Sequence, residues 1–210
     1  DDVITAGADG IVVTGTTGET ATLTDPEKLK LVEVGRSVSA GRAKIITGGG
    51  SNETAHAIEL YKASEKAGAD GIMIVTPYYN KPTQAGILTH FRLVADATDL
   101  PVILYDIPGR TGVPIKYETI LRLAKPPNIL AVKDATGHVE QGVERMHRTG
   151  LEYYAGDDAL NFAWMTGGAS GFISVVAHVA APLYRRMIDL LDAGQVWEAR
   201  ELAYSLRPLV

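Results

Sequence analysis

The chain has 210 residues, of which 46% are hydrophobic and 21% are charged, as is typical of a globular protein of ordinary size. Its formal net charge of −5 does not favour nucleic acid or an anionic membrane surface as a partner, and no apolar run approaches the roughly 18 residues of a membrane span. The absence of cysteine excludes disulfides, thiolate nucleophiles and cysteine-bound metals, and it fits a reducing cytoplasm.

The two ends of the sequence lead us to expect a longer polypeptide. The chain begins without methionine on DDVITAGADG, a polar segment typical of a helix end, and stops in ELAYSLRPLV, part-way through a helical pattern. We therefore expect further residues on both sides.

Seven short runs of apolar and β-branched residues recur along the chain. They are GIVVTG (10–15), AKIITG (43–48), GIMIVT (71–76), PVILYD (101–106), ILAVKD (129–134), EYYAGD (152–157) and FISVV (172–176). Because each run is short and apolar throughout, it is typical of a parallel strand buried on both faces.

Amphipathic stretches separate these runs and predict helices. They cover residues 25–39, 51–68, 83–98, 114–126 and 181–194. We expect Asp25 to be the N-cap before Pro26 in the first, and Ser51 or Asn52 to cap the second, which stops at Gly68. Strands that alternate with helices in this way predict βαβ units.

Both an open doubly wound sheet and a closed (β/α)8 TIM barrel fit this α/β alternation. The polar residues of interest lie at or after the strand ends: Thr16, Thr17, Glu19, Thr76, Tyr78, Tyr79, Tyr105, Arg110, Lys133, Gly156, Asp157, Asp158 and Ser174. In a barrel these positions converge on one face, whereas in an open sheet they spread along an edge. We therefore predict a barrel that forms a single domain over residues 1–210 and lacks one strand.

Two glycine-containing loops have different interpretations. GTTGET (15–20) is either a plain βα turn or a cradle of backbone N–H groups and hydroxyls for a carboxylate. ITGGGSN (46–52) lacks the G-x-G-x-x-G spacing, and no acidic residue closes the next strand, so it indicates a tight turn rather than a dinucleotide site.

Aromatic and cationic residues in two further loops keep both a structural and a functional interpretation. Tyr78 and Tyr79 in TPYYNKP (76–82) are either packing residues or proton relays. In LYDIPGRTG (104–112), Arg110 is either solvated or a planar fork for a substrate carboxylate.

Lys133, at the end of the apolar run ILAV, is the strongest candidate for chemistry. Without context, a lysine that ends a strand is more often structural than catalytic. A desolvated amine, however, can attack a ketone to form a Schiff base, and nearby tyrosines could move the protons. With the hydroxyls of Thr16 and Thr17 beside it, the pattern favours a 2-oxo acid such as pyruvate. The histidines give no metal-binding set, so we expect no metal or other cofactor.

The sequence resembles the dihydrodipicolinate synthase/N-acetylneuraminate lyase family over nearly its whole length. The resemblance rests on GTTGE (15–19), VTPYYNKP (75–82), LYDIPGRTG (104–112), VKDATG (132–137), AGDDA (155–159) and GFISV (171–175), in the order of the family. It implies a (β/α)8 barrel followed by C-terminal helices, from which this chain lacks the first βα unit and most of those helices.

The resemblance implies condensation of pyruvate with L-aspartate-4-semialdehyde to 4-hydroxy-tetrahydrodipicolinate, on the route to lysine and diaminopimelate. The implied roles are as follows: Lys133 forms the Schiff base, Tyr105 shuttles protons, Thr16 links Tyr105 to Tyr79 of a neighbouring subunit, Thr17 binds the pyruvate carboxylate, Arg110 helps to bind the semialdehyde carboxylate, and the carbonyls of Gly156 and Ile173 line the pocket. Because sugar-acid lyases of the family typically lack this arginine, Arg110 favours the synthase.

Some positions depart from the pattern of the family. Asp106 stands where asparagine is usual, Asp134 where glutamate is usual, and Thr20 where serine is common. At the positions that hold a lysine inhibitor in lysine-sensitive members, Asp25, Lys28 and His56 appear instead of two histidines and a glutamate. We therefore expect weak or absent feedback by lysine.

Three alternatives remain open at this point. One is a relative that cleaves a 2-keto-3-deoxy sugar acid or N-acetylneuraminate by the same imine chemistry. Another is a non-catalytic barrel that binds small molecules, and the last is a nucleotide-binding doubly wound domain. The family resemblance also implies a homotetramer built as a dimer of dimers. From the charge, hydropathy and lack of cysteine we expect a cytoplasmic protein with neither nucleic acid nor membrane as a partner.

Overall fold

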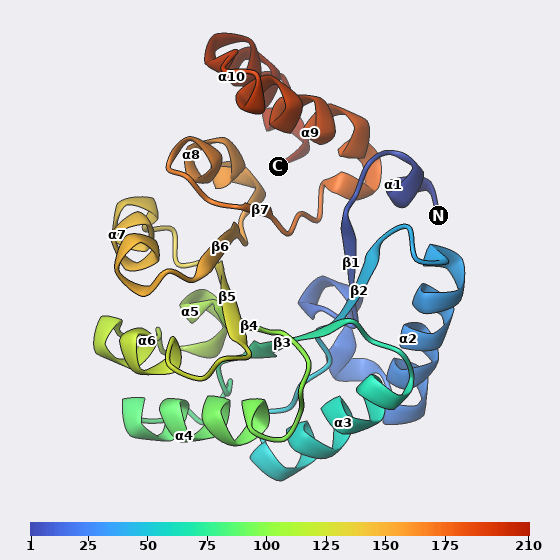
Figure 1. Ribbon diagram of the computed structural model, residues 1–210, viewed down its shortest axis with the longest axis vertical. Coiled ribbons are helices and arrows are strands. Elements are labelled where there is room, and N and C mark those ends of the chain that lie inside the picture. The colour runs from blue at the N-terminus through green and yellow to red at the C-terminus, as the bar shows by residue number, and fades with distance from the viewer.

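A computed structural model describes residues 1–210 and shows seven parallel strands in one curled sheet (Figure 1). The strands are β1 (Gly10–Val13), β2 (Lys44–Thr47), β3 (Gly71–Val75), β4 (Val102–Asp106), β5 (Ile129–Asp134), β6 (Glu152–Ala155) and β7 (Gly171–Phe172). Each strand pairs with the next one along the chain, in the order β1 to β7. This order is that of a barrel wall, and it excludes the strand reversal of a doubly wound sheet.

Helices surround the convex side of the sheet (Figure 1). The α-helices are α1 (Asp2–Thr5), α2 (Asp25–Ser39), α3 (Thr54–Lys66), α4 (Gln84–Ala95), α5 (Pro108–Thr111), α6 (Tyr117–Leu123), α7 (Val139–Thr149), α8 (Asn161–Thr166), α9 (Ala177–Asp192) and α10 (Val196–Ser205). The short 3-10 turns are η1 (Thr16–Gly18), η2 (Thr20–Thr22), η3 (Asp158–Leu160) and η4 (Arg207–Leu209). Helices α9 and α10 pack on each other beyond β7. None of the helices combines the length and the hydropathy that a membrane-spanning helix requires.

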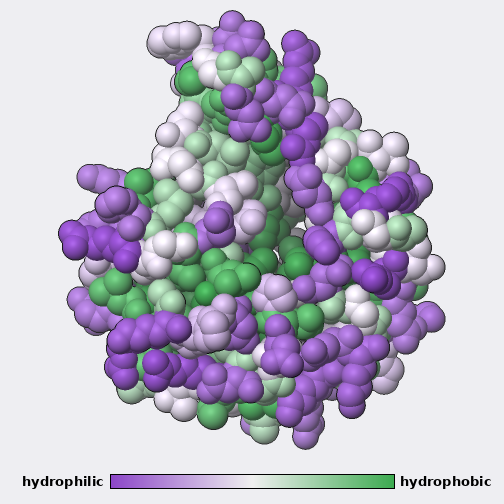
Figure 2. All heavy atoms as spheres, in the orientation of Figure 1, coloured by the Kyte–Doolittle hydropathy of each residue, from purple (hydrophilic) through white to green (hydrophobic).

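The main core lies between the outer face of the sheet and the helices. Ile72 and Leu104 of the strands are fully buried in one cluster with Ile87 and Phe91 of α4. Burying each such side chain stabilises the fold by about 1.5–3 kcal/mol. Figure 2 shows polar and charged residues around the rim of the viewed face and hydrophobic residues across its centre.

The curled sheet is not closed by a strand pair, because β1 pairs only with β2 and β7 only with β6. A side chain spans part of this opening instead. Arg185 of α9 donates to the carbonyl of Gly7 from Nε at 3.0 Å and from Nη2 at 2.7 Å, and it forms an ion pair with Asp9. The N-terminal segment is thereby fixed to α9, as the neighbouring α1 and α9 of Figure 1 show.

The predicted strand over residues 172–176 was wrong in its length, since β7 ends at Phe172. The N–H groups of Val175 and Val176 donate to the carboxylate of Asp158 rather than to a neighbouring strand. Ser174 therefore lies after the strand, where its Oγ accepts a hydrogen bond from the N–H of Ala177. An apolar run cannot show that a side chain will take the place of a strand partner.

The predicted caps of two helices were also wrong. Thr24, not Asp25, precedes the first turn of α2 and forms a capping box with Glu27. Glu53, rather than Ser51 or Asn52, caps α3 by accepting from the two N–H groups of Ala55 and His56. The helix stop at Gly68 is confirmed, because this glycine has φ +99°.

The sequence patterns did not predict helix α7, which follows β5. Gly142 lies in its middle, and glycine is a poor helix former. Here it is required, because a Cβ at this position would lie 1.9 Å from the ring of Trp164. Trp164 is itself stacked on Tyr153 of β6, with ring centroids 5.7 Å apart. The glycine thus allows α7 to approach the sheet closely.

Candidate active site

Lys133 and Tyr105 lie side by side at the ends of the two central strands. Tyr105 of β4 pairs in register with Lys133 of β5. Side chains at matched positions of neighbouring parallel strands lie on the same face of the sheet. The Nζ atom of Lys133 accordingly lies 4.3 Å from the centroid of the Tyr105 ring, close enough for a cation–π contact when the amine is charged. The predicted pair is therefore brought together by the register.

Burial changes the ionisation of Lys133. The residue is only 9% exposed, and desolvation lowers its pKa from 10.5 to about 8, while the negative charge of Asp158 acts in the opposite direction. At pH 7, about a tenth of an amine with this pKa is neutral, compared with less than about a thousandth for an ordinary lysine. A neutral amine beside a phenol is the arrangement that nucleophilic attack on a carbonyl needs.

Tyr105 is adapted to hold its proton. It is 4% exposed, and burial raises the pKa of its phenol. A side-chain hydrogen bond with Thr16 and the positive charge of Arg110 lower this pKa, but by less than burial raises it. The hydroxyl therefore stays protonated at neutral pH and can donate to an oxygen near Lys133. A protonated hydroxyl beside an amine is the geometry that general acid–base chemistry requires.

The GTTGET loop follows β1 at the same edge of the sheet. Thr14, directly before the loop, has φ +56°. Its hydroxyl donates to the carbonyl of Val13 at 2.6 Å and lies 3.2 Å from the hydroxyl of Thr47. The chain then turns into η1, in which Thr16 and Thr17 are exposed. The contact between Thr16 and Tyr105 joins this loop to the central strands.

The TPYYNKP loop places Tyr79 apart from the other predicted site residues. Tyr79 has φ +69° and is 88% exposed. Such a backbone conformation is uncommon for a bulky residue. Within the loop, Thr76 is buried and its hydroxyl donates to the carbonyl of Tyr105 at 3.4 Å. The loop is thus anchored at Thr76, while Tyr79 extends away and has no hydrogen bond to Thr16.

Arg110 lies in α5, directly after β4. The turn that carries it ends at Gly112, which has φ +81°. Its guanidinium is exposed and takes part in no ion pair or hydrogen bond within the chain. An arginine held on a short, well-defined turn with its donors free is suited to bind a carboxylate at two points.

The ends of β6 and β7 place Gly156 and Ile173 next to each other in space. The N–H of Gly156 donates to the carbonyl of Asp134 at 2.8 Å, and the N–H of Ile173 donates to that of Ala155 at 2.9 Å. A Cβ on Gly156 would lie 3.0 Å from the Cβ of Ala135, so a larger residue would push the loop away. We call the region at the carboxyl ends of the strands around Lys133 and Tyr105 the mouth. Backbone, rather than side chains, forms the part of it at Gly156 and Ile173.

The opposite face of β4 and β5 carries two buried acids. Asp106 and Asp134 pair in register and are 0% and 1% exposed. Burial raises the pKa of Asp106 to about 7 and also raises that of Asp134. Asp106 accepts from the N–H of Ile115 with both oxygens at 3.2 Å, and Asp134 accepts from the N–H and hydroxyl of Thr136. These acids hold loops and do not reach the mouth.

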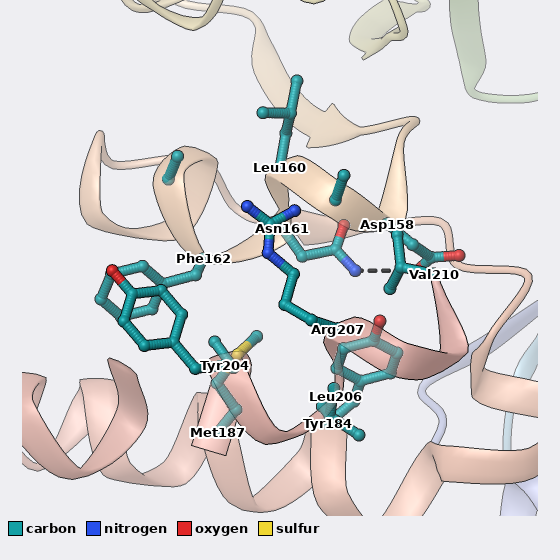
Figure 3. Close-up of a pocket in the computed structure, with 13 residues that line it drawn as sticks. Asp158, Leu160, Asn161, Phe162, Tyr184, Met187, Tyr204, Leu206, Arg207 and Val210 are labelled. Atoms are coloured by element: carbon teal, nitrogen blue, oxygen red, sulfur yellow. Dashed lines mark hydrogen bonds between the residues drawn. The ribbon is translucent and has the colours of Figure 1, made fainter. Parts of the chain in front are cut away.

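A separate cavity of about 210 Å³ lies between α8, α9 and α10 (Figure 3). It is mostly apolar, and its lining does not include Lys133 or Tyr105. Asp158 belongs to its wall, so this residue stands between the cavity and the mouth. No group of three or more histidine, aspartate or glutamate side chains gathers where it could hold a metal ion.

Asp158 is the residue at the mouth to which the sequence assigned no role. Its carboxylate charge reaches Lys133, and it binds two N–H groups after β7. The acidic pair Asp157-Asp158 directly after a strand is the signal that pointed to it. Only the structure shows that the second acid, rather than the first, makes these contacts.

Comparison with known proteins places this geometry in a family. The model of the dihydrodipicolinate synthetase family matches residues 1–210. The chain belongs to this family. A 4-hydroxy-tetrahydrodipicolinate synthase from Mycolicibacterium gilvum is 51% identical over 207 residues, which cover 99% of this chain and 68% of the relative. The resemblance inferred from the six motifs is confirmed.

Solved structures of the family have the same fold. A dihydrodipicolinate synthase from Acinetobacter baumannii complexed with pyruvate gives a TM-score of 0.95 at 41% identity, covering 99% of this chain and 72% of that one. A synthase from Cyanidioschyzon merolae with lysine bound gives 0.93 at 44% identity, covering 98% and 71%. A monomeric synthase variant gives 0.93 at 34% identity, covering 99% and 73%. The prediction of a TIM-barrel fold is confirmed.

Proposed function

We propose that the chain catalyses the condensation of pyruvate with L-aspartate-4-semialdehyde to 4-hydroxy-tetrahydrodipicolinate, through an imine on Lys133. One observation of the structure carries the proposal: a buried lysine with a lowered pKa lies 4.3 Å from the ring of a buried tyrosine. Membership of the family and the names of its curated relatives support the choice of reaction.

Imine formation needs one amine and one proton donor. The neutral amine of Lys133 attacks C2 of pyruvate. One proton from the amine and one from Tyr105 reach the carbonyl oxygen, which leaves as water, so that a protonated imine and the phenolate of Tyr105 remain. Loss of a proton from C3 then gives an enamine, and the phenolate of Tyr105 is the nearest base. The low exposure of both groups keeps bulk water from competing for these protons.

The enamine carbon attacks the aldehyde of the second substrate and forms the new C–C bond, and the aldehyde oxygen takes the proton that Tyr105 had removed from C3. The amino group of that substrate then displaces Lys133 from C2, which closes the six-membered ring and frees the enzyme. The chain returns to its starting state with one water released overall. Lys133 must therefore serve first as a nucleophile and later as a leaving group, which suits an amine whose pKa lies near neutrality.

Two parts of the mouth are suited to carboxylates. In this proposal, the hydroxyl of Thr17 binds the carboxylate of pyruvate, and the free guanidinium of Arg110 binds that of the semialdehyde. The carbonyls of Gly156 and Ile173 line the pocket. Because Arg110 lies in α5, the turn that follows the strand of Tyr105, it would hold the second substrate on the side of the acid-base group.

Borohydride reduction in the presence of pyruvate, followed by peptide mass mapping, tests the imine. A pyruvyl adduct on Lys133 is expected. Lys28 provides an internal control, because it is equally buried at 9% exposure but lies 3.3 Å from the carboxylate of Asp25. No adduct, or an adduct on Lys28 alone, contradicts the mechanism. Assays with the semialdehyde and with a 2-keto-3-deoxy sugar acid then separate synthase from sugar-acid lyase activity.

We also propose a homo-oligomer, a tetramer built as a dimer of dimers, in which Tyr79 enters the site of a neighbour beside Thr16. The 88% exposure of Tyr79 supports this arrangement, since a large aromatic side chain on a strained backbone is more often covered than left in water. Tyr79→Phe should lower turnover about 10-fold or more and leave imine trapping unchanged. Unchanged turnover, or a full-length protein that is active and monomeric by light scattering, contradicts this arrangement.

Weak feedback by lysine is a further part of the proposal. His56 lies 2.6 Å from one oxygen of Asp25, and Lys28 lies 3.3 Å from the other. The carboxylate is thus already paired, and a cation stands beside it, so that little attraction remains for the ammonium group of a lysine inhibitor. Half-inhibition of the full-length enzyme by sub-millimolar lysine would refute this.

We propose a cytoplasmic location for this reaction, which the absence of cysteine fits. A fluorescent fusion of the full-length protein should fill the cell interior. Fluorescence confined to the cell envelope or to the medium contradicts this location.

A further inference from the structure

Asp158 joins parts of the chain that are distant in sequence. Its Oδ2 accepts hydrogen bonds from the N–H groups of Val175 at 2.9 Å and Val176 at 3.0 Å. Its Oδ1 accepts from the side-chain amide of Asn161 at 2.8 Å, the bond drawn in Figure 3. One carboxylate therefore connects the loop after β6 with the start of α8 and the segment before α9.

The segment that Asp158 holds carries part of the mouth. After the N–H of Ile173 donates to the carbonyl of Ala155, the sheet ends, and the following residues have no strand partner. Side chains bind three of their N–H groups instead: Asp158 accepts from those of Val175 and Val176, and the hydroxyl of Ser174 accepts from that of Ala177. The path of the chain from Ile173 into α9 thus depends on this carboxylate.

Two buried side chains, one an amide and one aromatic, support Asp158 from behind. Asn161 and Tyr184 are 2% and 4% exposed, and both lie beside Asp158 in the wall of the cavity in Figure 3. Tyr184 packs on Phe172 of β7, with ring centroids 5.0 Å apart. A carboxylate held from behind by packed side chains keeps a fixed place relative to the sheet.

Asp158 also contributes charge to the mouth. The groups that face Lys133 are Tyr105 on β4, Tyr154 on β6 and Asp158, while Arg110 acts on Tyr105. Among them Asp158 is the acid that raises the pKa of Lys133 against desolvation. The two tyrosines have pKa values raised by burial, so they are neutral and add no negative charge.

We propose that Asp158 is a positioning residue for imine formation: it fixes the segment that carries Ile173 and sets the negative charge on the Lys133 side of the mouth. This inference rests on the proposed function. It assigns the residue two separable effects, one through the hydrogen bonds to Val175 and Val176 and the other through its charge.

Three variants of the full-length enzyme separate these effects. Asp158→Asn removes the charge and turns one acceptor into a donor, whereas Asp158→Glu keeps the charge but displaces it. Asp157→Asn is the matched control. The carboxylate of Asp157 is next to Asp158 in the sequence, but it is exposed and accepts only from the N–H of Ala159. For each variant, trapping of the pyruvate imine on Lys133 is measured against pH, together with kcat, KM and the thermal midpoint.

Asp158→Glu, which displaces the carboxylate, should lower kcat/KM for pyruvate by about 10- to 100-fold, since a small displacement of a reacting group is costly. In Asp158→Asn the acid limb of the trapping profile should move to lower pH, because loss of a negative charge lowers the pKa of Lys133. Asp158→Glu should keep the wild-type limb, and Asp157→Asn should stay within about twofold of wild type throughout.

Wild-type kcat/KM and an unshifted limb in Asp158→Asn overturn the inference. If that variant does not fold, Asp158→Glu decides in its place, with wild-type kcat/KM overturning the inference. A change in the thermal midpoint alone, without a change in kinetics, also overturns it. Absence of any adduct on Lys133 in the wild type contradicts the proposed function instead, so the two failures are distinguishable.

Discussion

The two faces of β4 and β5 carry buried ionisable groups one residue apart, with opposite consequences. On the inner face, Tyr105 and Lys133 lie at the mouth, where burial lowers the pKa of the lysine to about 8. On the outer face, Asp106 and Asp134 lie under the helices, where burial raises the pKa values of both acids. In both places desolvation disfavours the charged form.

The two faces differ in the hydrogen-bond partners of their ionisable groups. Both oxygens of Asp106 accept from the N–H of Ile115. One oxygen of Asp134 accepts from the N–H and the hydroxyl of Thr136, so both acids hold loops. The amine of Lys133 makes no hydrogen bond within the chain, and its close neighbour is the face of the Tyr105 ring. A perturbed pKa by itself therefore does not mark a catalytic group. The better candidate is a group with a perturbed pKa that makes no hydrogen bond within the chain and lies where the strands end.

The largest effect is expected from Lys133→Arg, on the inner face. The guanidinium stays protonated and cannot form the imine. Turnover should fall by at least about 10³-fold, and the pyruvate adduct should disappear from the mass map. The control is Lys28→Arg, which should retain the adduct. Residual turnover within 10-fold of wild type would show that another group is the nucleophile.

Tyr105→Phe is expected to have the next largest effect. It removes the proton donor beside Lys133 but keeps the buried ring. Turnover should fall by about 10²- to 10⁴-fold, as for other acid-base groups, with a smaller change in KM. The matched control is Tyr153→Phe, since Tyr153 of β6 is a buried tyrosine on the outer face. Equal losses in the two variants would remove the distinction between the faces.

Asp106→Asn should leave turnover within about twofold and change stability instead. Because the folded-state pKa of Asp106 is raised from 3.8 to about 7, its stabilising contribution is complete below about pH 4 and is lost as pH rises through 7. Asparagine cannot ionise and can still accept from Ile115. The variant should be more stable than wild type at pH 8, by on the order of 2–4 kcal/mol, and the gap should narrow at pH 5.

Urea denaturation of both proteins at pH 5 and pH 8 measures this change. A gap of the same size at both pH values would show that Asp106 is not a buried acid of raised pKa. A large loss of turnover in the folded variant would instead assign the outer face a part in the chemistry.

Much of the fold followed from local patterns. Six of the seven strands lie within the predicted ranges, and each is at most two residues shorter than its range. The agreement arises because short apolar runs must be buried on both faces of the sheet. Strand β7 and helix α7 did not follow, since each depends on a distant side chain. Strand β7 is short because Asp158 binds the N–H groups that follow it. Helix α7 contains Gly142 because a side chain there would collide with Trp164.

The site divides in the same way. That Lys133 and Tyr105 share a face could be predicted, because parallel neighbours in register place matched residues together. The roles of Thr16, Thr17, Arg110 and Tyr79 rested on family resemblance and stay predictions. The contacts of Asp158 could not be predicted, since they depend on how the loop after β6 meets the start of α9.

The rate of pyruvate imine trapping on Lys133 as a function of pH tests the central claim most directly. If burial at the mouth creates the nucleophile, the rate should rise with pH and level off above about pH 8, with the adduct on Lys133. A rate that continues to rise towards pH 10, as for an ordinary lysine, would contradict the account, as would an adduct on any other residue.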